Sequence, residues 1–233
     1  MRLSTQDRDL LCQLFMFGGT TGGQTALQDL FPAGLRRREL CLDVLRPVAD
    51  HLGALWLRDE AAFMSVRVAT LRMEALLRTT AKPINPVISK KRKQAVFASV
   101  PGEDHTFGVQ MVADLQRAKG WDVQLVVNAS GTDLLSEIVN SPAEILGLSI
   151  GSSSSMHALY TTVQMVKEHR PDVKILVSGA LVGLDARPVE LLGVAAHADD
   201  FERAETLLDA LVDATSTPRA YSNVVTVLPP YPL

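Results

Sequence analysis

A single histidine stands between two acidic residues and a glycine in the stretch GEDHTFG. Glu103 and Asp104 come directly before His105, and Gly108 follows it. A histidine ring can bind a transition metal through one nitrogen while a carboxylate accepts the hydrogen of the other nitrogen. Taken alone, a loop histidine is more often an ordinary solvated residue. The interpretation of His105 therefore depends on the elements that position it.

Five short apolar segments alternate with helical patterns in the second half of the chain. They are the expected strands, at 94–100, 121–127, 144–150, 173–179 and 194–198. Helices are expected at 108–119, 131–140, 156–169, from about 185, and at 200–214. Nearly continuous apolar strands alternating with helices predict a parallel sheet covered on both faces. We expect a flavodoxin-like α/β fold with strand order 2-1-3-4-5 and a ligand crevice where strands one and three end.

This topology gathers small polar residues around the histidine. His105 follows the first strand, the serine-rich loop 149–155 follows the third, and the segment 178–180 follows the fourth. A phosphate-binding glycine loop and a response-regulator site with several acids both fit this rim poorly. A narrow slot lined by glycine and serine better suits a bulky ligand held at the sheet edge. For Ser154 and Ser155, capping of the next helix is an equally good interpretation.

The first 80 residues have helical periodicity. Helices are expected at 5–16, 25–31, 40–56 and 60–80, with Pro47 kinking or restarting the third and GGTTGGQ forming a flexible turn. The run from Arg36 to Arg38 is expected on an exposed helix face. We divide the chain into a small helical bundle at 1–80, a basic proline-containing linker at 81–93, a sheet domain at 94–214 and a tail at 215–233.

The overall composition argues against several classes of function. The chain has 233 residues, a formal net charge of -3 and a pI near 6.0, so no global field draws it to nucleic acid or an anionic membrane. Its two cysteines, Cys12 and Cys41, fit neither a disulfide framework nor a zinc spacing. No apolar run approaches the roughly 18 residues of a membrane span, and no signal peptide pattern is present. We expect a cytoplasmic protein without strong direct DNA binding.

The ordered motifs resemble those of cobalamin-binding domains. The pattern ExHxxG at 103–108 is similar to their DxHxxG signature, GLSIGSSSSM to their SxL loop, and VSGALVGLDARPVELLGVAAHADD to their GG turn and closing strand. Independently, LRPVADHLGALW at 45–56 resembles the LxPxxxxxGxxW pattern of a helical cap over the upper face of cobalamin. The resemblance implies cap, linker and cobalamin domain in that order.

The resemblance also implies a cofactor and its site. Cobalamin would bind base-off and His-on, with His105 as the lower cobalt ligand, the dimethylbenzimidazole tail between strands one and three, and Trp56 over the upper ligand. Haem on the same scaffold is the less favoured alternative. The implied cofactor-binding set comprises Trp56, Glu103, Asp104, His105, Thr106, Gly108, Ser149, Gly151, Ser153, Ser155, Ser178, Gly179 and Ala180, with His105 as the metal ligand.

Several positions depart from the family pattern. Glu103 replaces an aspartate, and its extra methylene is expected to displace the carboxylate–imidazole pair or turn it to solvent. Gly151 stands at the leucine of SxL, and Ser178 at the first glycine of GG, so the tail slot is altered. Where capped photoreceptors carry a Glu-His pair, this chain has Val66 and Arg67, so that position offers no upper histidine ligand.

The combination is most similar to the AerR/PpaA antirepressors of photosynthetic bacteria. That resemblance implies a light- or redox-responsive regulator that relieves repression of photosystem genes by contact with a repressor protein. We find no arrangement of a nucleophile and a base in the sequence that would indicate an enzyme. A corrinoid shuttle for methyl transfer and a haem-based redox sensor remain the alternative functions.

Overall fold

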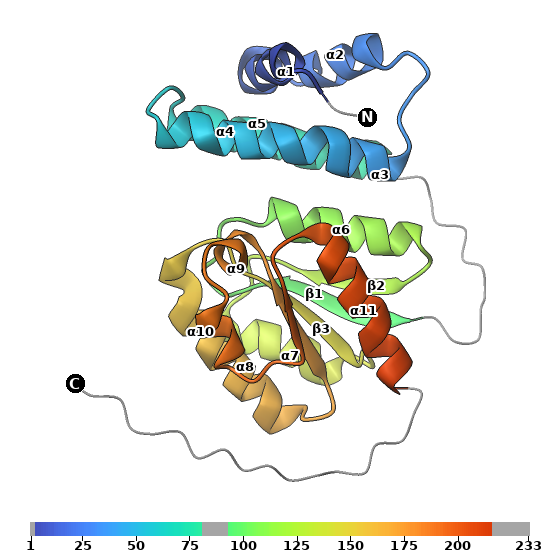
Figure 1. Ribbon diagram of the computed structural model, residues 1–233, viewed down its shortest axis with the longest axis vertical. Coiled ribbons are helices and arrows are strands. Elements are labelled where there is room, and N and C mark those ends of the chain that lie inside the picture. Colours follow the sequence, from blue (N-terminus) through green and yellow to red (C-terminus); the bar gives the residue numbers. More distant parts are fainter. Residues whose placement is uncertain (1–2, 81–92, 216–233) are drawn as a thin grey trace.

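The protein folds into a helical half and an α/β half, one above the other in Figure 1. The computed structural model describes residues 3–80 and 93–215. The expected linker and tail therefore lie almost wholly outside the described residues. The helical half consists of α1 (Thr5–Phe17), α2 (Gly22–Leu30), α3 (Arg37–Glu39), the π-helix η1 (Leu40–Leu45), α4 (Arg46–Leu57) and α5 (Phe63–Thr80).

The α/β half is a five-stranded parallel sheet in the order β2-β1-β3-β4-β5, which confirms the predicted fold class. Its strands are β1 (Gln94–Ser99), β2 (Asp122–Val126), β3 (Ile145–Ser149), β4 (Lys174–Ser178) and β5 (Ala196–Ala198). Its helices are α6 (Phe107–Ala118), α7 (Gly131–Asn140), the 3-10 turn η2 (Ser153–Ser155), α8 (Met156–His169), α9 (Ala180–Leu184), α10 (Arg187–Glu190) and α11 (Phe201–Thr215).

Both faces of the sheet are buried, as the apolar strands predict. Val96, Ala98 and Leu148 belong to the core cluster shared with α7 and α8. Ala95 and Phe97, which alternate with them, belong to the cluster shared with α6 and α11. The strand ends are therefore held rigidly by two cores, and the loops that follow them are fixed in place at one edge.

Two details of the helical half differ from or refine the sequence expectation. The chain restarts at Pro47 as expected: the wide turns of η1 end at Leu45, and Pro47 lies in the first turn of α4, where its missing N–H is not needed. The glycine-rich segment is not a free turn throughout, because α2 already begins at Gly22. A Cβ on Gly23 would lie 2.4 Å from the Phe15 ring, so glycine here allows α2 to approach α1.

The two halves share a hydrophobic core along α6. Phe107, Met111 and Leu115 of α6, with Phe201 of α11, belong to the same buried cluster as the apolar side chains of the helical half. The sheet half therefore supplies apolar surface that the helical half covers. Burial of this kind favours the observed placement of the two halves.

Three arginines at 36–38 were expected on an exposed helix face, and this expectation is wrong for Arg37. Arg37 is 17% exposed and forms a bidentate pair with Asp114 of α6, in which the Nη2–Oδ1 distance is 2.7 Å. Its Nη2 also donates to the Leu77 carbonyl of α5 at 2.6 Å. Arg38 lies over the Phe201 ring, with 5.2 Å between Cζ and the centroid. Arg36 and Arg38 are exposed as expected, with side chains 86% and 48% exposed.

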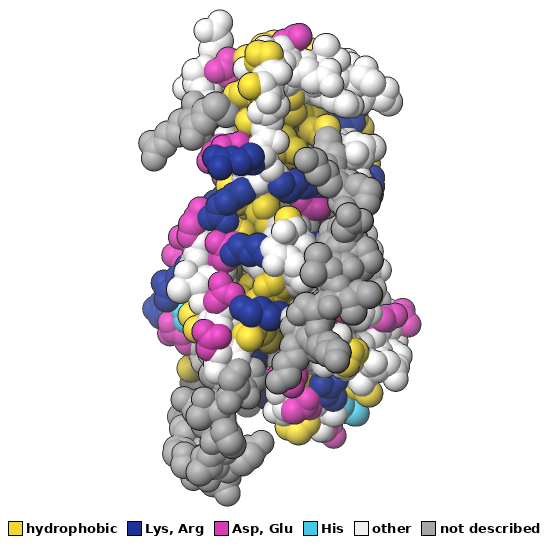
Figure 2. Space-filling model, turned by 90° about the vertical axis from the view of Figure 1, so that its right-hand side faces the viewer, with side chains coloured by type: hydrophobic (Ala, Val, Ile, Leu, Met, Phe, Trp, Pro, Cys, Tyr) yellow, Lys and Arg dark blue, Asp and Glu magenta, His cyan; other side chains and the backbone are white. Residues whose placement is uncertain are grey.

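A seam of ion pairs continues from this junction onto the sheet half. Figure 2 shows Lys and Arg side chains in a column with acidic side chains beside them. Glu205 of α11 accepts from Arg38 at 3.1 Å and from Lys119 at 2.6 Å, and Lys93 pairs with Asp209 at 2.9 Å. These charges are partly exposed, so each contributes little to stability.

Replacing Arg37 with alanine should destabilise the protein by about 2–4 kcal/mol, because Asp114 and the Leu77 carbonyl would lose a buried charged partner. Urea unfolding followed by circular dichroism measures this change. Arg203→Ala is the matched control. Arg203 pairs with Asp199 at 3.7 Å, and its side chain is 57% exposed, so the expected loss of stability is within about 0.5 kcal/mol. Equal losses in the two variants would contradict the structural role of Arg37.

Candidate functional site

The loop after β1 begins with a tight turn that aims Glu103 inward. The Glu103 N–H donates to the Val100 carbonyl at 3.0 Å, and Gly102 has φ 78°. Proline at the second position and glycine with positive φ at the third are typical of a type II turn, which Pro101 and Gly102 supply here. The local sequence thus explains why Glu103 turns back toward the sheet instead of pointing into solvent.

Glu103 joins His105 to the loop after β3. Its Oε1 accepts hydrogen bonds from the His105 backbone N–H at 2.9 Å and from the His105 Nδ1 at 2.5 Å. Its Oε2 accepts from the backbone N–H groups of Gly151 at 2.8 Å and Ser152 at 3.0 Å. Four donors therefore converge on one carboxylate whose side chain is 1% exposed.

This arrangement fixes the chemistry of the imidazole. An ionised carboxylate can only accept, so Nδ1 carries the hydrogen and Nε2 of the neutral ring keeps its lone pair free. The His105 side chain is 66% exposed, which leaves Nε2 open to a ligand. The hydrogen bond to Glu103 raises the pKa of His105, opposed by partial burial and by the positive charge of Arg67. Burial alone would raise the pKa of Glu103, but its hydrogen bonds outweigh that effect and lower it to about 2.

The expectation that the longer Glu103 would be displaced or solvent-facing is wrong. The extra methylene lets one carboxylate reach both the imidazole and the N–H groups at Gly151 and Ser152. Its charge is compensated by these four donors, which is why burial is tolerated. The carboxylate–imidazole pair is therefore intact in this chain, with glutamate in the position where the family pattern has aspartate.

Gly151, at the position of the family leucine, lies against the histidine ring. A Cβ built on Gly151 would be 2.8 Å from both Cβ and Cγ of His105 and 3.0 Å from Nδ1. Those distances are too short for contacts with the root of a side chain, so His105 would have to move. The departure from the family pattern thus makes room for the observed position of the histidine.

Gly151→Ala should therefore weaken cofactor retention by roughly 10-fold, because the displaced ring loses its hydrogen bond to Glu103. Affinity can be measured by titrating cobalamin and following its absorbance. Gly131→Ala is the matched control, since its added Cβ would meet only Met165 Cε at 3.9 Å. Unchanged affinity in Gly151→Ala would show that the ring position does not matter.

Three serines lie side by side where β1, β3 and β4 end. Ser99 is in register with Ser149, and Ser149 with Ser178, so their side chains share one face of the sheet. Ser99 and Ser149 are buried, at 3% and 8% exposure, and the Ser99 Oγ has no hydrogen-bond partner within the described part of the chain. A buried hydroxyl without a partner is rare in folded proteins, and an ordered water or a ligand would satisfy it. The sequence interpretation missed Ser99, although its place as the last residue of the first strand could have identified it.

The other residues of the predicted site lie in the loops that follow β1, β3 and β4, and their side chains differ in exposure to solvent. Thr106 and Ser155 are buried, Ser178 and Gly179 are half-buried, and the exposed ones are Asp104, Gly108, Ser153 and Ala180. Ser155 precedes α8 without a side-chain cap, whereas Ser152, which was not predicted, accepts from the Ser154 N–H at 3.3 Å. Gly108 lies in the first turn of α6, and an added Cβ there would meet nothing within 4 Å, so the structure does not itself require glycine at this position.

Trp56 lies in the last turn of α4, and exposed apolar side chains gather where α4 ends and α5 begins. Trp56 is 45% exposed and packs edge-to-face on Phe63, with 6.2 Å between ring centroids. Leu57 and Met64 beside it are 78% and 66% exposed. Figure 1 shows the connection between α4 and α5 on the same side of the molecule as the start of α6, and Arg67 of α5 is close enough to affect the pKa of His105. Exposed apolar side chains thus lie on the side of the molecule that carries His105.

The donor set suits a metal that arrives with ligands of its own. Across residues 3–80 and 93–215 there is no group of three His, Cys, Asp or Glu side chains that could hold a bare metal ion. One imidazole with its outer carboxylate instead fits the axial position of a macrocycle-bound metal.

In the same described ranges, no helix combines the length and apolarity that crossing a membrane would need.

The parallel sheet in the order β2-β1-β3-β4-β5, preceded by a helical half, defines a Rossmann-like protein with a histidine at its switch point. The family model of the B12 binding domain matches residues 93–212, slightly more than half of the chain. This protein therefore belongs to the B12 binding domain family.

Two further proteins show how far the similarity extends. An uncharacterized 20.5 kDa protein in the bchF-crtJ intergenic region of Rhodobacter capsulatus is 24% identical over 160 residues, which cover 66% of this chain and 82% of that protein. The solved monomethylamine corrinoid protein of Methanosarcina barkeri has a TM-score of 0.68 at 17% identity. That likeness covers 91% of this chain and all of the other, so it shows that both halves share the fold.

The residues present fit a corrinoid. The free Nε2 of His105 and the unpartnered hydroxyl of Ser99 are two features that the described part of the protein does not itself use. They lie on the rim where the first and third strands end, which is where ligands bind in open α/β sheets.

Proposed function

We propose that this protein is a cytoplasmic, cobalamin-binding regulator that responds to light or redox state and relieves repression by contact with a repressor of photosystem genes. The observation that carries the proposal is the exposed His105 Nε2, held in one tautomer by the buried Glu103. A regulator needs a bound chromophore and a responsive surface, and it needs no catalytic residues. The two buried, unpaired cysteines agree with a reducing compartment.

His105 would hold the corrinoid base-off and His-on, with Glu103 keeping its Nε2 available. The serines at the ends of β1, β3 and β4 would line the slot for the tail, and Trp56 would cover the upper face. When bound, cobalamin supplies a cobalt centre whose upper ligand changes with light or redox state. Arg67 stands where the capped photoreceptors carry a histidine, and a guanidinium does not ligate cobalt, so that position would supply no upper ligand.

A contact between the halves offers a route from the site to the surface. Thr106 directly follows His105, and its hydroxyl donates to the buried Glu74 of α5 at 3.5 Å. Gln110 of α6 donates to the same hydroxyl at 3.2 Å. A movement of the His105 loop would therefore be felt in α5, which belongs to the helical half. The repressor would read the changed placement of that half.

The relative in the bchF-crtJ region supports the regulatory proposal, since it ties a similar chain to a photosynthesis gene region. A corrinoid shuttle for methyl transfer is the second candidate. The intact Glu103–His105 pair favours it, because that pair is the ordinary outer ligand arrangement of a histidine-ligated metal. A haem-based redox sensor is the third and uses the same histidine.

The test is to mix the purified full chain with hydroxocobalamin, adenosylcobalamin or haemin, separate it by gel filtration and record absorbance spectra. We expect a corrinoid to be retained and haemin not to be. Capture of the repressor with the loaded protein, in the dark and after illumination, then separates a regulator from a shuttle. Retention of haemin alone would replace the cofactor assignment, and capture of no repressor in either condition would favour the shuttle.

A further inference from the structure

Arg67 of α5 is a cation near His105 that the described part of the chain leaves unpaired. Its side chain is half-buried, and within residues 3–80 and 93–215 it forms no hydrogen bond and no ion pair. The positions three and four residues away on its own helix, which could pair with it, are Phe63, Met64, Thr70 and Leu71, and none of them is acidic. A guanidinium carries five N–H donors, so Arg67 is free to bind an acceptor that a ligand brings.

The packing of α5 brings Arg67 to the side of the helical half that meets the His105 loop. Glu74, seven residues after Arg67, accepts from the Thr106 hydroxyl at 3.5 Å. Seven residues make nearly two helical turns, so Arg67 lies on the same face of α5 as Glu74, about 10 Å along the axis. The hydrogen bond to Glu103 raises the pKa of His105, and the charge of Arg67 opposes that rise, so Arg67 is within electrostatic range of the ring.

The charges around His105 come from two different halves of the molecule. Glu103 and Asp104, which also act on the pKa of the ring, belong to its own loop, whereas Arg67 belongs to the helical half. A ligand bound between the halves would therefore meet His105 on one side and Arg67 on the other. Met64 and Leu71, on the same face of α5 as Arg67, are apolar and 66% and 46% exposed. A cation flanked by apolar side chains is screened less by water, so its effect on a nearby charge is larger.

We propose that Arg67 selects a small anionic upper ligand for the corrinoid bound at His105. The inference rests on the proposed function, because it needs a corrinoid on His105. A guanidinium stabilises an anion through charge and charge-assisted hydrogen bonds, and it offers a neutral ligand much less. Arg67 is thus a specificity residue. It does not bind cobalt, but it determines which charge is favoured on the ligand that does.

The test loads the full chain with hydroxocobalamin and titrates either azide, an anion, or imidazole, at constant ionic strength and at a pH where imidazole is neutral. The absorbance spectrum of the corrinoid measures the affinity for each ligand. Compared with free hydroxocobalamin, the loaded parent should prefer azide over imidazole by about 10-fold more. Arg67→Met should lose this preference through weaker azide binding, with the affinity for imidazole unchanged. Arg67→Lys should keep part of it, because the charge remains but the guanidinium fork is lost.

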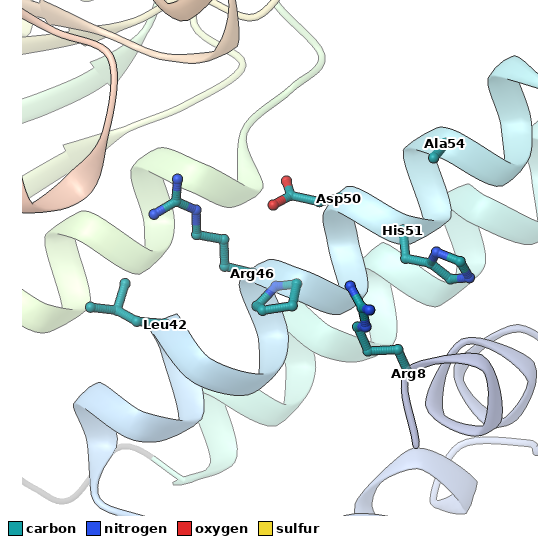
Figure 3. Close-up of a pocket in the computed structure, with 7 residues that line it drawn as sticks. Arg8, Leu42, Arg46, Asp50, His51 and Ala54 are labelled. Atoms are coloured by element: carbon teal, nitrogen blue, oxygen red, sulfur yellow. The ribbon is translucent and has the colours of Figure 1, made fainter. Parts of the chain in front are cut away.

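Arg46→Met is the matched control. Arg46 is also an arginine of the helical half, with a side chain 40% exposed, but its Nη1 lies 3.9 Å from the Glu202 Oε2. Figure 3 shows its head group on the same side of α4 as Asp50, at a recess that none of the predicted site residues lines. The loaded Arg46→Met protein should bind azide and imidazole as the parent does.

Three results would overturn this inference alone. The loaded parent could prefer azide no more than free hydroxocobalamin does, a result that needs no variant to fold. Arg67→Met, folded by circular dichroism, could keep the preference of the parent. It could also weaken azide and imidazole equally, which would show a general disturbance of the site. A parent chain that retained no hydroxocobalamin on gel filtration, which precedes the titrations, would instead contradict the proposed function and this inference with it.

Discussion

His105→Ala should abolish retention of cobalamin on gel filtration, with a loss of affinity of more than about 100-fold. Loss of an outer partner of a metal ligand already costs about 10- to 100-fold, and loss of the ligand itself should cost at least as much. His105 is exposed at 66% and contributes little to the core, so the variant should fold normally. Titration of hydroxocobalamin followed by absorbance measures the affinity, and circular dichroism checks the fold.

The control for this variant is His169→Ala. His169 lies in the last turn of α8, where its Nδ1 is 2.9 Å from the Met165 carbonyl oxygen, and it belongs to no predicted site. It should retain cobalamin with an unchanged spectrum. If His105→Ala retained the corrinoid with the spectrum of the parent, the axial-ligand assignment would be wrong.

Glu103→Gln should weaken cobalamin binding by about 10- to 100-fold while leaving His105 in place. An amide has one acceptor oxygen and an NH₂ group, so it cannot accept from both the imidazole and the N–H groups of the loop after β3. The imidazole then loses the partner that fixes Nδ1–H and raises the basicity of Nε2. The change should appear as a weaker affinity and as an altered spectrum of the bound form.

Because Glu103 is buried, its replacement should also lower stability, and this must be separated from its effect on the ligand. Four donors lose a charged acceptor, at a cost of about 1.5–3 kcal/mol for such a bond. Urea unfolding without cofactor measures that part. Glu168→Gln, an exposed position in α8, should change neither quantity. A Glu103→Gln protein that is destabilised but binds cobalamin normally would show that Glu103 is structural only.

The strands and most helices could be predicted from the sequence, because each is encoded locally, and their alternation indicated the strand order of a known topology. Apolar segments near Phe97 and Leu146 have the length and composition of buried parallel strands, and α8 agrees with its expected range of 156–169. The flexible turn predicted through Gly22 and Gly23 was wrong, because packing on Phe15 favours a helix there. That contact comes from another helix and leaves no local signal.

The junction between the halves could not be predicted in the same way. The run Arg36–Arg38 has the composition of an exposed face, yet Arg37 is held by Asp114, which lies far along the chain. A sequence pattern shows that a residue is charged but not which distant element will cover it. The same holds for Glu74, whose buried contact with Thr106 crosses between the halves.

The sequence by itself determined that His105 lies at the switch point of a parallel sheet, since strand periodicity and motif order are local properties of the chain. Only the tertiary structure decided what Glu103 does. From its length, we expected the carboxylate to be displaced, but the loop after β3 brings two N–H groups within hydrogen-bond distance of it. A buried charge is stable only where such donors converge, and their convergence depends on the packing of strands that are distant in sequence.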